Sequence, residues 1–232
     1  MKKLLSYFSK FELFLWFISL FMIILSFCIF GGDGYLTLIA SLIGATSLIF
    51  GSKGNPISQI LMIAFSVLYG VISYSFKYYG EMITYLGMTL PMAVISLISW
   101  LKNPHGEGHA EVEVNTISKR ETAFALALTT VTTVVFCFIL KSLNTVNLLI
   151  STLSVFTSFL AAYLTFRRSP YFPFAYALND CVLIVLWIMA TIENLAYMSV
   201  IVCFLVFLVN DSYCFINWKR LQKRQQIENG LR

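Results

Sequence analysis

The sequence carries little charge: Asp, Glu, Lys and Arg make up 12% of its 232 residues. With 59% hydrophobic residues and a mean hydropathy of +0.81, the composition excludes an ordinary water-soluble domain. What the chain has instead is a series of long apolar runs. We therefore predict an all-α membrane protein.

The chain also lacks the motifs of catalysis and nucleotide use. It contains no Gly-rich phosphate-binding loop, no zinc signature of the H-E-x-x-H type and no G-x-S-x-G elbow. Its five cysteines stand singly, without C-x-x-C spacing, and are interpreted as small buried apolar side chains. We therefore expect no enzyme activity, no catalytic residue, no cofactor and no metal.

An apolar stretch of about 18 or more residues is long enough to cross a membrane as a helix. Eight such stretches nearly fill the sequence and leave no room for a separate soluble domain. The predicted spans are Phe11–Phe30, Tyr35–Gly51, Pro56–Phe76, Gly80–Leu101, Glu121–Leu140, Thr145–Phe166, Pro173–Ala190 and Asn194–Asn217.

The cations fall almost entirely on alternate connections. Short loops rich in Lys and Arg stay in the cytoplasm, so this asymmetry predicts both termini inside a bacterial cytoplasmic membrane. The net charge of +5 then needs no nucleic-acid partner, because the basic tail 219–232 is expected to contact anionic lipid. The predicted cytoplasmic set is Lys2, Lys3, Lys10, Lys53, Lys102, Lys119, Arg120, Arg167, Arg168, Lys219, Arg220, Lys223, Arg224 and Arg232, against Lys77 and Lys141 on the other side.

The longest connection, residues 102–120, divides a single membrane domain, 1–232, into halves of about 11–101 and 121–218. It contains His105 and His109 among glutamates and glycines, which suggests either a metal site or a solvated cytoplasmic linker. We favour the linker, because a Gly-rich loop does not fix ligand geometry.

The two halves end alike, with Trp100 and Trp218 each just before a lysine at the predicted cytoplasmic edge. Because four spans separate equivalent positions, we predict parallel repeats related by an axis along the membrane normal. Such repeats place a substrate site at their interface. Tryptophans are common at membrane edges, so this echo alone is weak.

Two polar pairs lie inside apolar spans, Asn179-Asp180 and Asn210-Asp211. A carboxylate in the middle of a membrane helix costs about 2.5 to 3.5 kcal/mol on insertion scales, so such residues face other helices or water. We predict that Asn179 and Asp180 line a binding site. Asn210 and Asp211 are predicted to form an inner gate or to pair with a neighbouring span.

Helix geometry extends this site along the seventh span. At about 100° per residue, Asp180, Trp187, Phe172 and Asn179 all fall within about 60° of Tyr176. Aromatic rings, an amide and a carboxylate suit a nucleoside, and a carboxylate with aromatic faces suits a cationic one. The alternative is that the rings pack and the polar groups bond between helices.

In the first half, Ser66 lies on a polar stripe with Tyr69 beside it, and this stripe is a candidate wall of the pathway. Close helix packing is the alternative for small polar residues. Met88 shares a face with Pro91, which lacks an N–H and can kink its helix. We predict Pro91 and Met88 as a hinge or gate, with a static kink as the alternative.

The chain resembles the PnuC family of bacterial vitamin transporters. The likeness is carried by Tyr78–Met82 (Tyr-Tyr-Gly-Glu-Met), Leu90–Met92 running on to Trp100, the closing Asn217-Trp218-Lys219, and Lys10–Glu12 before the first span. It departs from the family at Ala93, where many members have Gln, and at Phe172–Tyr176, where they have a tryptophan pair. The resemblance implies a SWEET-like bundle of two three-helix units, with a homotrimer as the conceivable assembly.

The resemblance also implies facilitated diffusion of nicotinamide riboside, trapped by intracellular phosphorylation. We therefore predict a transporter that works by alternating access around a ligand near the midplane. Three alternatives stay open: another nucleoside or thiamine as ligand, proton coupling through Asp180, and a membrane enzyme or sensor subunit.

Overall fold

The computed structural model is all-helical in the part of the chain that it describes, residues 7–30, 34–75, 79–106, 110–192 and 195–230. Eight helices there are long and apolar enough to cross a membrane, as predicted. The fourth is continuous but formed of three segments, and a short 3₁₀ turn, η2 (Leu195–Tyr197), precedes the last. The elements are α2 (Lys10–Phe30), α3 (Tyr35–Ser52), α4 (Ile57–Ser75), α5 (Tyr79–Thr84), η1 (Tyr85–Thr89), α6 (Leu90–Lys102), α7 (Lys119–Ser142), α8 (Leu148–Phe166), α9 (Phe172–Thr191) and α10 (Met198–Gly230).

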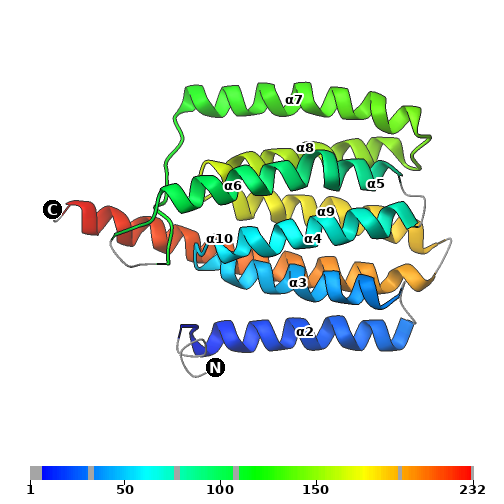
Figure 1. The fold of residues 1–232 in the computed structure, drawn as a ribbon, viewed down its shortest axis with the longest axis horizontal. Coiled ribbons are helices and arrows are strands. Elements are labelled where there is room, and N and C mark those ends of the chain that lie inside the picture. The colour runs from blue at the N-terminus through cyan, green and yellow to red at the C-terminus, as the bar shows by residue number, and fades with distance from the viewer. Residues whose placement is uncertain (1–6, 31–33, 76–78, 107–109, 193–194, 231–232) are drawn as a thin grey trace.

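Six of the spans form a closed ring. Going round it, α3 packs on α4, α4 on the α5–η1–α6 span, α6 on α8, α8 on α9, α9 on α10, and α10 back on α3. The other two spans lie outside: α2 packs against α3 and α10, and α7 packs mainly against α8 (Figure 1). Each half therefore contributes three ring helices and one peripheral helix.

Local sequence signals fix where the helices begin. Ser9 and Glu12 form a capping box at the start of α2, since each side chain accepts a hydrogen bond from the other residue's backbone N–H, at 3.2 and 2.7 Å. Asn55 Oδ1 accepts the N–H of Ile57 at the start of α4, and Ser118 Oγ accepts that of Glu121 at the start of α7. The helices thus begin within a few residues of their predicted positions.

The fourth span contains one wide turn, the π-helical η1, immediately before α6. The N–H of Leu90 bonds to Tyr85 O, five residues back. Pro91 follows at the first turn of α6, and it has no N–H with which to continue the ordinary ladder. This irregularity is consistent with the kink predicted at Pro91.

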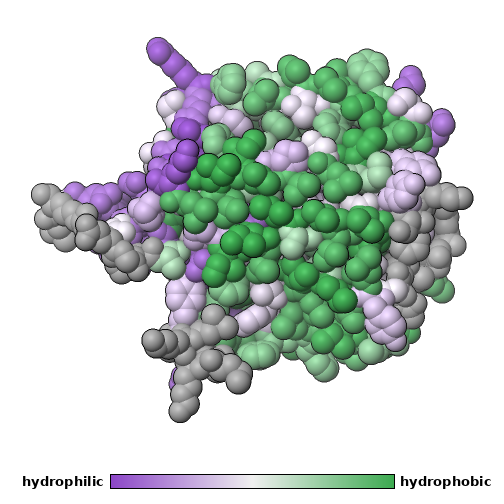
Figure 2. Space-filling model, viewed as in Figure 1, coloured by the Kyte–Doolittle hydropathy of each residue, from purple (hydrophilic) through white to green (hydrophobic). Residues whose placement is uncertain are grey.

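The outer surface of the bundle is apolar. Large side chains are exposed on the peripheral helices, for example Phe14 at 65% and Phe138 at 70%. Figure 2 shows a broad hydrophobic band across the middle of the molecule, with hydrophilic residues gathered at the end that bears the C-terminus. A belt of this kind matches the hydrocarbon layer of a bilayer.

Both described chain ends lie at the same end of the bundle (Figure 1), here called the terminal end. The helix connections place the cations of residues 10, 53, 102, 119, 120, 167, 168, 219, 220, 223 and 224 there, and Lys141 at the opposite, far end. Lys2, Lys3, Lys77 and Arg232 lie outside the described residues. The charge asymmetry predicted along the chain is therefore present in three dimensions.

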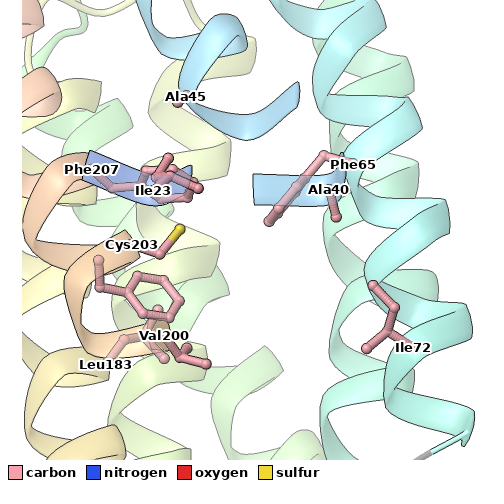
Figure 3. Packing of buried hydrophobic residues seen from close by; sticks show 10 residues of the cluster. Ile23, Ala40, Ala45, Phe65, Ile72, Leu183, Val200, Cys203 and Phe207 are labelled. Carbon is pink, nitrogen blue, oxygen red and sulfur yellow. The ribbon is translucent and has the colours of Figure 1, made fainter. Parts of the chain in front are cut away.

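The largest buried apolar cluster joins α2, α3, α4, α9 and α10. Figure 3 shows Ile23, Ala40, Phe65, Leu183 and Phe207 within it. A Cβ at Gly44 would lie 2.7 Å from Phe207 Cζ, so only glycine allows α3 to approach this ring so closely. The cluster fixes the spacing between helices of the first and second halves.

The two edge tryptophans make matching bonds across the halves. Trp100 Nε1 donates to Thr165 O at 2.9 Å near the end of α8, and Trp218 Nε1 donates to Gly51 O at 2.8 Å near the end of α3. The residue before each tryptophan donates to the carbonyl one residue further along the same helix end. Ser99 Oγ donates to Phe166 O, and Asn217 Nδ2 donates to Ser52 O. Carbonyls at the ends of α8 and α3 thus accept hydrogen bonds from the other half, while Thr165 O and Gly51 O also accept the N–H groups of Arg168 and Gly54.

The connection between the halves is more ordered than predicted. We call residues 103–118 the strap; residues 107–109, His109 among them, lie outside the described part. Val112 is fully buried and its N–H bonds Gly54 O at 3.0 Å. His105 pairs with Glu228 at 2.8 Å. The described part of the linker therefore makes fixed contacts across the terminal end, and all of its residues except Val112 are exposed or partly exposed.

The buried side chain of Gln225 on α10 makes three hydrogen bonds to the strap, beside the contacts of Arg224 and Glu228. Gln225, 3% exposed, donates from Nε2 to Val112 O at 3.1 Å and to Glu111 Oε1 at 2.8 Å, and its Oε1 accepts the N–H of Val114 at 2.8 Å. Trp218, Leu221 and Gln225 are buried on one face of α10. This face explains why the helix continues to Gly230, well beyond the predicted end at Asn217.

Candidate substrate-binding cavity

The ring of six spans encloses a central cavity. Residues of α3, α4, the α5–η1 stretch, α8, α9 and α10 line it, and it has about 110 Å³ that the centre of a water molecule can reach. Aromatic and aliphatic side chains form most of the wall, with hydroxyl, amide and carboxylate groups set among them. This composition is typical of a small-molecule site.

Helix α9 supplies the wall that the sequence singled out. Phe172, Tyr176, Asn179 and Asp180 all line the central cavity. Their spacing of three or four residues places them on one side of the helix, as the 100° periodicity predicts. The structure therefore brings these four candidates together, while their part in binding stays a prediction.

Asn179 is oriented by the neighbouring helix. Its Oδ1 accepts hydrogen bonds from Thr157 Oγ1 at 2.8 Å and from Ser158 Oγ at 3.0 Å, both on α8. With the oxygen held by two hydroxyls, the amide nitrogen is the group left to donate to a ligand in the cavity. A side chain fixed in this way needs no reorganisation on binding.

Two carboxyl groups meet in the same cavity. Asp180 on α9 and Asp211 on α10 are 4% and 3% exposed, and both line the cavity. Asp180 Oδ2 and Asp211 Oδ1 are buried without a hydrogen-bond partner. Among the described residues that line the cavity there is no Lys, Arg or His. The pair is therefore a strong acceptor for a cation or for hydroxyl groups.

Aromatic rings close the cavity toward the terminal end. Phe172 packs edge-on against Trp218 with ring centroids 4.7 Å apart, and Trp100 lies 5.5 Å from Trp218. Both tryptophans are fully buried, and Val112 of the strap joins the same cluster. We call Trp100, Phe172 and Trp218 the aromatic seal. Phe172 thus belongs both to the cavity wall and to this seal at the terminal end.

Three candidates lie elsewhere. Trp187 lines a second cavity toward the far end, where its ring centroid is 5.3 Å from that of Tyr197. Ser66 is fully buried and donates to Met62 O at 2.8 Å within its own helix. Tyr69 stacks between Phe65 and Tyr85 and lines a small pocket beside α2 and α10. None of the three lines the central cavity.

The candidates for a gate also separate. Asn210 faces α2, because its Nδ2 donates to Ser19 Oγ at 2.8 Å, whereas Asp211 faces the cavity. Met88 is buried against Leu140, Val155 and Phe159. Pro91 lies at the exposed start of α6. Of these four residues, only Asp211 lines the central cavity.

Several residues of the cavity wall were not predicted as part of the site, and Glu81 is the charged one among them. Glu81, at the far end of the α5–η1 span, lines both the central and the second cavity. The sequence signal was present, since a carboxylate near the start of an apolar span is costly unless it faces water or protein. Glu81 was noted only as part of the Tyr78–Met82 motif.

Eight apolar helices, six of them in a ring around a cavity with polar groups in its wall, are the architecture of a membrane transporter. The chain belongs to the nicotinamide mononucleotide transporter family, whose model matches residues 34–220. It is 28% identical over 201 residues to the nicotinamide riboside transporter PnuC of Neisseria mucosa, an alignment that covers 84% of this chain and 76% of that one.

A solved structure supports the same assignment. The crystal structure of the vitamin B3 transporter PnuC matches with a TM-score of 0.80 and 25% sequence identity, over 94% of each chain. The predicted PnuC resemblance and the class of multi-pass membrane transporter are therefore confirmed. The chain is a transporter and not an enzyme.

Proposed function

We propose that this protein takes up nicotinamide riboside across a bacterial cytoplasmic membrane and binds it in the central cavity. The observation that carries the proposal is the composition of that cavity. Aromatic rings, an oriented amide and two buried carboxyl groups face one space, and no Lys, Arg or His is among the described lining residues. The relative from Neisseria mucosa, named a nicotinamide riboside transporter, supports the same substrate.

Each part of the substrate has a suitable partner in this cavity. The pyridinium ring is a delocalised cation, which the carboxylates of Asp180 and Asp211 attract and the ring of Tyr176 can face. The Asn179 amide nitrogen is placed to donate to the carboxamide oxygen. Serine and threonine hydroxyls of α8 are available to the ribose.

The same charges disfavour the mononucleotide for which the family is named. A phosphate group would bring negative charge into a cavity with Glu81, Asp180 and Asp211 and without a cation among its described lining residues. Like charges at short range repel strongly in a low-dielectric site. We therefore propose the riboside, not its phosphate, as the transported form.

Alternating access between the two halves is the proposed mechanism. The equal share of ring and peripheral helices in the two halves and the paired tryptophan bonds support two repeats that rock about the ligand. The cations at the terminal end support a cytoplasmic location for it. In the simplest version, transport is facilitated diffusion, and phosphorylation inside the cell traps the riboside.

Proton-coupled transport is the second candidate, and the burial of Asp180 and Asp211 in one cavity favours it. Two buried carboxyl groups with no Lys, Arg or His among the described lining residues favour a proton on one of them, which an arriving cation would displace. The titratable groups around the pair are Glu81, Tyr85, Tyr176, Cys203 and Cys214. Uptake that is accelerated by an imposed pH gradient would select this mechanism over simple diffusion.

The proposal is tested by uptake of radiolabelled nicotinamide riboside into proteoliposomes. We expect saturable uptake that excess unlabelled riboside abolishes and that nicotinamide mononucleotide, other nucleosides and thiamine leave nearly unchanged. Liposomes without protein give the background. Saturable uptake of the mononucleotide, or of thiamine in place of the riboside, would overturn the substrate assignment.

Asn179→Ala should raise the KM for riboside uptake about threefold to tenfold. One neutral hydrogen bond contributes about 0.5 to 1.5 kcal/mol, and about 1.4 kcal/mol is a tenfold change. Thr157 keeps bonds to the carbonyls of Leu153 and Ser154, so α8 should remain in place. The control is Thr152→Val on α8, the helix that holds Asn179 in place, because Thr152 Oγ1 is buried without a partner and Thr152 does not line the cavity. Equal KM values for the two variants would remove Asn179 from the site.

A further inference from the structure

A second cavity opens on the central one toward the far end of the bundle. We call it the far-end cavity; it has about 540 Å³ that the centre of a water molecule can reach. Its walls are the start of α5, the α7–α8 connection, the last turns of α9 and η2. Gly80, Glu81, Thr145 and Ser151 line both cavities, so the two spaces adjoin along a shared wall.

We propose that the far-end cavity is a separate binding subsite for an aromatic cation, and that Glu81 passes this cation to the central cavity. The proposal rests on the proposed function, because the same substrate would bind in the far-end cavity before it reaches the central cavity. It assigns a role to Trp187 outside the central cavity and to Glu81 where the two cavities adjoin.

Paired aromatic rings suit this cavity to a flat cation. The rings of Trp187 and Tyr197 both line it, with centroids 5.3 Å apart and planes inclined at 57°. Because the two rings are tilted, one can present its face and the other its edge to a ligand. That ligand would lie between the rings and the opposite wall of the cavity. Tryptophan is the strongest partner for a cation above a ring face.

The opposite wall is polar. It contains Asn144, Thr145 and Asn147 from the turn that joins α7 to α8. Asn144 and Asn147 have φ of 53° and 55°, a left-handed conformation that asparagine tolerates. A wall of amides and hydroxyls opposite a pair of rings matches a sugar attached to an aromatic base.

Glu81 supplies the charge at the junction. It lines both cavities, and no Lys, Arg or His is among the described lining residues of either. A Cβ at Gly80 would lie 2.8 Å from Thr145 Oγ1 and 2.9 Å from Leu140 Cδ2, so the chain passes very close to the α7–α8 turn here. A carboxylate at this narrow point attracts a cation along the path toward Asp180 and Asp211.

Binding to the far-end cavity can be measured without transport. 1-Methylnicotinamide, methylated on the ring nitrogen, is a pyridinium cation that quenches tryptophan fluorescence on contact, and it is the probe for purified protein in detergent. We expect saturable quenching that is lost in Trp187→Phe and weakened about tenfold in Glu81→Gln. Glu81→Asp should retain it, and Glu113→Gln, an exposed carboxylate at the terminal end, is the matched control.

Transport gives the second readout. For the cationic riboside, Glu81→Gln should raise KM about tenfold, whereas uptake of the neutral dihydronicotinamide riboside should not change. A residue with only a structural role would affect both forms alike. Saturable quenching that is unchanged in Trp187→Phe and Glu81→Gln would overturn the subsite, even if riboside uptake is normal. Quenching as expected without riboside uptake would retain the subsite and refute the proposed function.

Discussion

Asp180→Asn should lower the apparent affinity for nicotinamide riboside about 10- to 100-fold. The substitution keeps the shape of the side chain and removes its charge, in a cavity where Asp180 is 4% exposed. Hydrogen bonds to charged groups contribute about 1.5 to 3 kcal/mol, and about 1.4 kcal/mol is a factor of ten. The measurement is the KM for uptake into proteoliposomes together with direct binding by isothermal titration calorimetry.

The control for this prediction is the neighbour of the second carboxylate. Asn210 precedes Asp211 but faces Ser19 on α2, so Asn210→Ala should lower thermal stability and leave KM unchanged. Asp211→Asn should resemble Asp180→Asn, and the double variant should lose less than the product of the two effects, because the groups act on one cation. Wild-type affinity in both single variants would exclude the pair from the site.

Gln225→Leu should open the terminal end of the transporter. The substitution removes three hydrogen bonds to the strap and leaves buried backbone groups of Val112 and Val114 without partners. Each such group costs about 1 to 3 kcal/mol, so the open population should rise about 10-fold or more. The reporter is Cys214, which is buried and lines the central cavity above the aromatic seal.

The experiment uses a variant in which Cys214 is the single cysteine, the other four being replaced by serine or alanine. A bulky, membrane-impermeant maleimide is added from the side that bears the termini, and the rate of labelling is followed. Gln226→Leu is the matched control, because it changes the same residue type on the exposed side of the same helix. Equal labelling rates in the two leucine variants would show that the strap does not close this end.

The sequence predicted the class and most of the α9 wall because both follow from periodicity. Hydropathy located the eight spans, and the 100° rule grouped Phe172, Tyr176, Asn179 and Asp180. The same rule failed to separate Trp187, which shares their face but lies eleven residues beyond Tyr176. At 1.5 Å per residue this is about 16 Å along the helix, deep enough to reach a different cavity.

Other differences have equally local reasons. Consecutive residues on a helix point about 100° apart, and here Asn210 is directed to Ser19 on α2 whereas Asp211 lines the cavity. Ser66 satisfies its hydroxyl within its own helix, which a stripe of small polar residues does not reveal. The order of the strap depends on Gln225, more than a hundred residues away in the sequence. Contacts of that kind have no periodic signal, and only the folded chain makes them visible.

The paired tryptophan bonds also set an order of assembly during synthesis. The carbonyls of Gly51 and Ser52, at the end of α3, accept hydrogen bonds from Trp218 and Asn217. The ribosome makes these two residues only when the last membrane span is nearly complete. The carbonyls that end α8 receive Ser99 and Trp100 from a helix already in the membrane. The newly inserted first half therefore lacks the Asn217 partner of Ser52 O and the Trp218 bond to Gly51 O until the last helix has been translated.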